Sequence, residues 1–107
     1  MTDGALPFRV EVLLSLQRAL WDMVTPSLRG VAVRLQYPLI EARLIFEAVG
    51  EEERMIAAEV GSYVIADFAP PVDISFVAVA APLGTPRELS ANEEWVYLRR
   101  ETDTAQS

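Results

Sequence analysis

The chain has 107 residues, of which 51% are hydrophobic and 23% are charged, a composition typical of one small globular domain. It contains no Cys, His or Lys, so all nine basic residues are Arg, which excludes thiol, imidazole, Schiff-base and P-loop chemistry. The formal net charge of −7 argues against a nucleic-acid-binding surface, because such surfaces need a basic face.

Residues 7–24 are predicted to form an amphipathic helix. Apolar residues within 13–23 recur at the spacing of one helical face, and polar residues that include Ser15 and Asp22 occupy the other. Pro26 should end the helix, since a residue that precedes proline is disfavoured in the helical conformation.

Residues 28–47 are predicted to form a β-hairpin. Apolar and polar residues alternate with a period of two along 31–37 and again along 40–46. A two-stranded hairpin is only marginally stable alone, so we expect the apolar face of the first helix to cover it.

A second helix is predicted to begin after Gly50. The glutamates at 51–53 suit the positive end of a helix dipole, and helix-forming residues follow them. Gly61 weakens the pattern, so two interpretations stay open. The helix either continues to about residue 68, or it ends at Val60 and a strand follows at 62–68.

Two further strands are predicted, at 72–81 and 94–100, after the helix-breaking Pro70-Pro71. The loop that joins them, 82–93, is long for a connection within a small domain. Long loops often carry function, so this loop is a candidate for partner contact.

The element order is therefore α-β-β-α-β-β. Its most economical packing is an α+β, two-layer domain, in which a four-stranded, mostly antiparallel sheet carries both helices on one face. We expect a single domain over 1–107, with flexible ends at 1–6 and 101–107. The longest uncharged stretch, 74–86, is too short to span a membrane, and the lack of Cys suits a cytoplasmic protein.

Four stretches of the chain carry a resemblance to a known family: residues 13–20 (LLSLQRAL), 24–31 (VTPSLRGV), 64–68 (VIADF) and 95–101 (WVYLRRE). In this order they resemble small bacterial immunity proteins encoded beside contact-dependent growth inhibition toxins. The resemblance implies a non-catalytic cytoplasmic protein without a cofactor. It implies that such a protein binds the C-terminal domain of a cognate toxin, often a nuclease, and occludes its active site.

The charge distribution indicates where a partner would bind. Residues 51–107 contain eleven acids and four Arg, whereas residues 1–50 contain five of each, so the excess charge lies wholly in the second half. Complementary charge speeds association and selects partners, so we expect a basic toxin surface. The candidate partner-binding residues are Glu52, Glu53, Glu59, Tyr63, Asp67, Asp73, Glu88 and Glu93.

Tyr63 is included because an interface is usually anchored by a few aromatic or Arg side chains, and this tyrosine, next to Gly61-Ser62, is expected to be exposed. The other candidate anchors follow helix or strand spacing, which is more typical of core residues: Trp21, Tyr37, Trp95 and Tyr97.

Two functions other than immunity have some support in the sequence. In a carboxylate enzyme, Glu93 and Glu94 could supply an acid and a base, but adjacent residues on a strand point to opposite faces, so they could not serve one pocket. We therefore predict no catalytic residue, metal site or cofactor, and no direct contact with nucleic acid or a membrane. The alternative function is a generic interaction or regulatory domain without a toxin partner, which could be homodimeric; self-association stays open.

Overall fold

The structure, a computed structural model, describes residues 7–101. Six elements follow one another: α1 (Phe8–Ala19), β1 (Leu28–Gln36), β2 (Leu39–Phe46), α2 (Glu51–Ala66), β3 (Asp73–Ala80) and β4 (Glu93–Leu98). The α-β-β-α-β-β order and the α+β class predicted from the sequence are confirmed. Flexible ends were predicted at 1–6 and 101–107, and of these residues all but Glu101 lie outside the described part of the chain.

The four strands form one sheet in the order β3-β2-β1-β4. β1 is antiparallel to both β2 and β4, whereas β3 is parallel to β2. This parallel pair follows from the connection, because α2 crosses over the sheet and returns the chain to the end at which β2 began. The sheet is therefore mixed but mostly antiparallel, as predicted.

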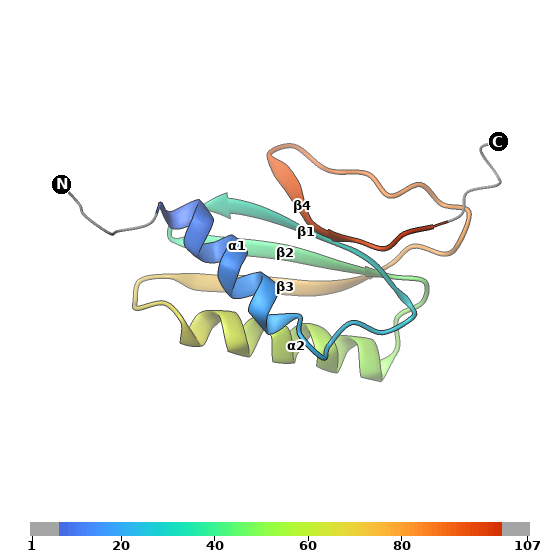
Figure 1. Cartoon of the computed structure of the whole chain (residues 1–107), viewed down its shortest axis with the longest axis horizontal. Helices are drawn as coiled ribbons and strands as arrows, with labels where there is room; N and C mark the ends of the chain where they lie inside the picture. Colours follow the sequence, from blue (N-terminus) through green and yellow to red (C-terminus); the bar gives the residue numbers. More distant parts are fainter. Residues whose placement is uncertain (1–6, 102–107) are drawn as a thin grey trace.

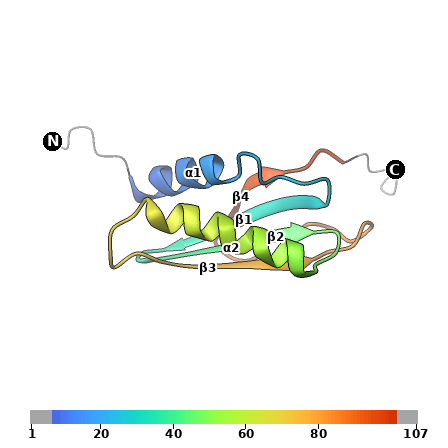
Figure 2. The ribbon, with the colours of Figure 1, turned by 90° about the horizontal axis from the view of Figure 1, so that it is seen from below.

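Both helices cover the same face of the sheet (Figures 1 and 2). In the turned view of Figure 2, α1 and α2 run next to each other, and β3 lies beneath α2. The hydrophobic core fills the space between the two layers, and its largest fully buried side chains include Leu16 of α1, Val33 of β1, Leu44 and Phe46 of β2, and Val60 of α2.

α1 is shorter than the predicted helix, and the side that it exposes to solvent differs from the predicted side. It ends at Ala19, and residues 20–23 form turns in which Asp22 has a left-handed backbone with φ of 67°. Ser15, which we predicted on the solvent side, is buried, because it faces α2 and donates a hydrogen bond to Asp67.

α2 continues to Ala66, so the alternative with a strand at 62–68 is wrong. Gly61, which weakened the helical pattern, is buried against β3. A Cβ atom at this position would lie only 2.7 Å from Cδ1 of Ile74. The glycine thus allows close packing of helix on sheet instead of ending the helix.

β4 contains an irregularity that moves its aromatic residues apart. The register shifts between Val31 and Ala32 of β1, so Val31 pairs with Tyr97 and Ala32 pairs with Trp95. Tyr97 packs against the core beneath the helices. Neighbouring residues of β1 face opposite sides, so the bulge puts Trp95 on the other face, whereas residues two positions apart on a regular strand would share one.

The crossover from β3 to β4, residues 81–92, runs back alongside β4 (Figure 1). Arg side chains attach it to the sheet. Arg43 donates to the carbonyl oxygen of Glu88, and Arg87 donates to the carbonyl oxygens of Arg29 and Arg99. The loop is therefore held along its length by hydrogen bonds.

A buried ion-pair cluster ties β1 to the segment after β4. The guanidinium of Arg29, whose side chain is only 4% exposed, donates two hydrogen bonds of 2.9 Å to the carboxylate of Glu101. Arg99 also donates to Glu101, at 2.9 Å, and to Glu47 at 2.7 Å. The hydrogen bonds from Arg29 lower the pKa of Glu101 to about 2. Glu101 is therefore bound, which corrects the prediction that a flexible end begins at this residue.

Candidate functional site

The structure separates the eight candidate partner-binding residues into two sets. Four of them lie on the solvent-exposed side of α2 and at its end, at helical spacing: Glu52, Glu59, Tyr63 and Asp67. The other four occupy different parts of the molecule: Glu53, Asp73, Glu88 and Glu93. Only the first set forms a continuous surface.

Glu53 and Asp73 both accept hydrogen bonds from nearby backbone groups. Oε1 of Glu53 accepts a hydrogen bond of 2.7 Å from the backbone N–H of Gly50, which stabilises the start of α2. Oδ1 of Asp73 accepts one of 2.9 Å from Ile74 at the beginning of β3. Because Ile74 packs toward the core, Asp73 faces away from the helices.

Glu88 and Glu93 lie with the crossover. The carboxylate of Glu93 accepts two hydrogen bonds from Arg43, at 2.7 and 2.8 Å, and its side chain is only 7% exposed. These bonds lower the pKa of Glu93, against the opposing effect of burial. The side chain of Glu88 is exposed, but its carbonyl oxygen also accepts from Arg43. Glu93 thus stabilises the fold and is not part of the candidate surface.

The adjacent carboxylates Glu93 and Glu94 point to opposite sides of the sheet, as predicted. Glu94 accepts hydrogen bonds of 2.7 and 2.9 Å from Arg9 of α1, whereas Glu93 is bound by Arg43 on the other face. The hydrogen bond from Arg9 lowers the pKa of Glu94, against the effect of burial. The two carboxylates therefore do not share a pocket.

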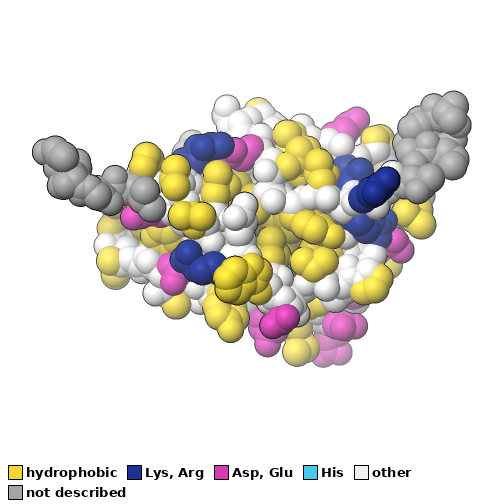
Figure 3. Space-filling view, in the orientation of Figure 1, with side chains coloured by type: hydrophobic (Ala, Val, Ile, Leu, Met, Phe, Trp, Pro, Cys, Tyr) yellow, Lys and Arg dark blue, Asp and Glu magenta, His cyan; other side chains and the backbone are white. Residues whose placement is uncertain are grey.

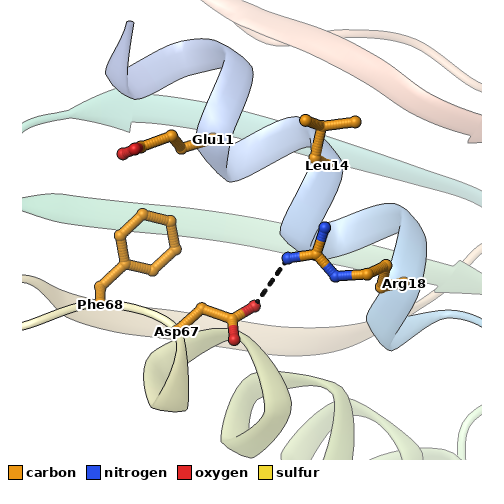
Figure 4. Close-up of a pocket in the computed structure, with 5 residues that line it drawn as sticks. All are labelled: Glu11, Leu14, Arg18, Asp67 and Phe68. Atoms are coloured by element: carbon orange, nitrogen blue, oxygen red, sulfur yellow. Dashed lines mark hydrogen bonds and ion pairs between the residues drawn. The ribbon is translucent and has the colours of Figure 1, made fainter. Parts of the chain in front are cut away.

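α1 and α2 lie side by side with a groove between them. One hollow in this groove, of about 230 Å³, is drawn in Figure 4. Arg18 of α1 reaches across to Asp67 at the end of α2, with 3.2 Å between Nη2 and Oδ2. The same Oδ2 accepts a hydrogen bond of 2.6 Å from the buried Ser15. The remaining lining residues are Glu11, Leu14 and Phe68.

A second hollow of about 370 Å³ shares Arg18 and Asp67 with the first. Trp21 and Tyr63 line it and are 71% and 64% exposed, which confirms the predicted exposure of Tyr63. Trp21 was not among our site residues, because its spacing suggested the core. No sequence signal indicated its exposure, because the turns at 20–23 fall within the helix predicted over 7–24. The remaining lining residues are Ser15, Ala19 and Asp22.

The two hollows and the outer side of α2 form one surface, which we call the acidic helical face: Glu11, Leu14, Arg18, Trp21, Asp22, Glu52, Met55, Glu59, Tyr63 and Asp67. This surface contains five carboxylates and one Arg, and that residue, Arg18, forms an ion pair with Asp67. Figure 3 shows hydrophobic side chains among charged ones over the helices, and acidic side chains gathered at the start of α2. Exposed Trp, Tyr and Arg surrounded by polar groups are typical of protein-binding surfaces.

Among residues 7–101, no group of three or more His, Cys, Asp or Glu is arranged so that it could hold a metal ion. No helix in the same part of the chain is long and apolar enough to cross a membrane.

The sequence was compared with known proteins. No curated protein matches it. A family model described as MafI2 immunity protein matches residues 9–101. This range includes both helices and all four strands, apart from Phe8 at the start of α1. The resemblance to bacterial immunity proteins is thereby confirmed, with MafI2 as the family in place of contact-dependent growth inhibition. The chain belongs to the MafI2 immunity protein family, which supports a toxin-neutralising role.

Proposed function

We propose that this protein neutralises a cognate toxin by binding the toxin domain in a one-to-one complex through the acidic helical face and covering its active site. Family membership supports the toxin-neutralising role. The exposed pair Trp21 and Tyr63, set among five carboxylates, is the observation that carries the choice of surface. In this proposal the protein is an inhibitor without catalytic activity of its own and acts in the cytoplasm.

The charge of this face favours a basic toxin surface. Domains that cleave nucleic acids expose such surfaces, because they must bind the phosphate backbone. An acidic inhibitor competes for the same groups and is attracted to them over a distance of about 10 Å at ordinary ionic strength. We therefore propose a nuclease as the class of toxin.

Co-expression with the toxin domain encoded beside this protein tests the role itself. We expect cells that carry both proteins to grow, cells that carry the toxin alone to die, and the two chains to purify together in equal amounts. A protein that neither rescues growth nor forms a complex, or that is a stable homodimer which ignores the toxin, would contradict the proposal.

Charge reversal on α2 should slow association with the toxin. Glu52→Arg combined with Glu59→Arg changes two exposed residues that make no side-chain hydrogen bond or ion pair with described residues, so the fold should persist. We expect association in low salt to slow about tenfold, and the difference from wild type to shrink as salt is added, because added ions screen the attraction. Stopped-flow or biosensor kinetics would measure both effects.

The matched control reverses two acids outside the acidic helical face. Asp73→Arg combined with Glu88→Arg produces the same change in net charge on exposed residues of β3 and the crossover. This variant should associate within about twofold of wild type. Equal slowing by both double variants would show that net charge matters and the acidic helical face does not.

A further inference from the structure

The hollow between Trp21 and Tyr63 has the chemistry of a socket for one cationic side chain. We infer that it receives an arginine side chain of the toxin, whose guanidinium stacks on the aromatic rings and is bound by neighbouring carboxylates. This inference rests on the proposed toxin-binding function and adds to it the partner group that is recognised and the residues that recognise it.

The aromatic residues provide the first part of the argument. Trp21, in the turn after α1, and Tyr63, on α2, line the same hollow of about 370 Å³, and both residues are mostly exposed. The aromatic pairs found among residues 7–101 involve Phe8 with Tyr37 and Phe8 with Phe68, so neither ring of the hollow is used in such a pair. The faces of exposed rings attract cations, and Trp does so most strongly.

Carboxylates provide the second part. Asp22 and Asp67 both line the hollow. Oδ2 of Asp67 is bound by Ser15 and Arg18, while its Oδ1 accepts no hydrogen bond from any described residue. An arriving guanidinium could therefore bind Asp67 without breaking the contact between the helices.

The backbone at Asp22 has a φ of 67°, in the left-handed region that glycine adopts freely and that Asp and Asn adopt more readily than other residues. Glycine would suffice to turn the chain after α1, whereas aspartate also places a carboxylate at the hollow.

Charge complementarity decides which side chain fits. The hollow contains two carboxylates and one Arg, and that Arg is already paired, so an anion would be repelled. A purely apolar side chain would leave Oδ1 of Asp67 and the carboxylate of Asp22 without a protein partner among residues 7–101. A guanidinium matches both the aromatic rings and the carboxylates of the hollow, because it is planar, stacks on rings and donates paired hydrogen bonds to carboxylates.

A titration of the isolated protein tests the socket without the toxin. The probe is N-acetyl-argininamide, and its neutral isostere, N-acetyl-citrullinamide, is the control at equal ionic strength. The indole N–H signals of Trp21 and Trp95 are followed by NMR, with Trp21→Phe for assignment. Trp95 lies beside Gly30, outside the hollow, and serves as an internal reference.

We expect the arginine probe to shift the Trp21 signal with a dissociation constant of about 1–50 mM, and the citrulline probe and the Trp95 signal to show little change. Asp22→Asn keeps a residue that tolerates the left-handed backbone and removes the charge, so binding should weaken at least about threefold. Equal shifts with both probes, or an unchanged response in Asp22→Asn, would overturn the inference.

The complex provides the second measurement. Trp21→Ala removes an exposed side chain, so folding should be unaffected, while the affinity for the toxin should fall at least about thirtyfold, mainly through faster dissociation. Growth rescue by wild type together with a silent arginine titration would reject the socket and leave the toxin-binding role intact. Loss of rescue by wild type would reject the role itself.

Discussion

Glu101→Gln should lower the free energy of unfolding by about 3 kcal/mol at pH 7. The carboxylate is bound by Arg29, whose side chain is only 4% exposed, and by Arg99. The variant removes the negative charge and leaves the guanidinium of Arg29 buried without its counter-ion. Urea denaturation, which adds no salt, would measure the loss.

The effect should depend on pH in a defined direction. The pKa of Glu101 is about 2 in the folded protein and 4.5 ordinarily, so its ionised form stabilises the fold fully above pH 4.5. This stabilisation decreases as the pH falls toward 2, and about 1.5 kcal/mol should remain at pH 3. The wild-type protein and Glu101→Gln should therefore become more similar in stability as acid is added.

Glu88→Gln is the matched control for this prediction. It makes the same chemical change on an exposed side chain of the crossover, and unfolding should change by less than about 0.5 kcal/mol. A difference between wild type and Glu101→Gln that stays constant from pH 7 to pH 3 would show that packing, and not charge, makes Glu101 important.

Gly30→Val should also destabilise the protein, by about 2–3 kcal/mol. A Cβ atom on Gly30 would lie 2.9 Å from Cζ3 of Trp95 and 3.3 Å from the carbonyl oxygen of Tyr97. The indole can move aside, but the carbonyl belongs to the β4 backbone and is fixed by pairing with β1. Thermal or urea unfolding measures the loss, and Gly50→Ala, whose Cβ would have 3.5 Å to its nearest neighbour, is the mild control.

A double-mutant cycle separates the two clashes at Gly30. Gly30→Ala should cost less in the background of Trp95→Leu, which lacks the indole ring, with a coupling of at least about 1 kcal/mol. Strictly additive losses would mean that the ring does not restrict this position and that the β4 backbone alone does.

Much of the fold could be predicted from local patterns. The alternation within 28–47 and the glutamates at 51–53 placed the hairpin and the start of α2 correctly. Gly61 could not be interpreted in the same way, because its role depends on the distance to Ile74 of a strand that follows later in the chain. The bulge that separates Trp95 from Tyr97 likewise arises from pairing with β1 and not from β4 itself.

The candidate site was predictable only in part. The exposure of Tyr63 was correctly predicted from its polar neighbours, and the acids of α2 were found by counting charge. The importance of Trp21 depends on how α1 packs beside α2, which no pattern within α1 reveals. Glu93 has the composition of a surface residue, but Arg43 of a distant strand binds it.

The pairing of β1 with β4 has a consequence for the order of folding. The Arg29–Glu101 contact joins residues 72 positions apart, so the chain entropy lost on closing this loop is large, and non-local contacts of this kind form late. β1, the most buried strand, therefore keeps an open edge until β4 pairs with it. An intermediate in which β4 has not docked would expose that edge to other chains, so aggregation is favoured before this last strand pairs.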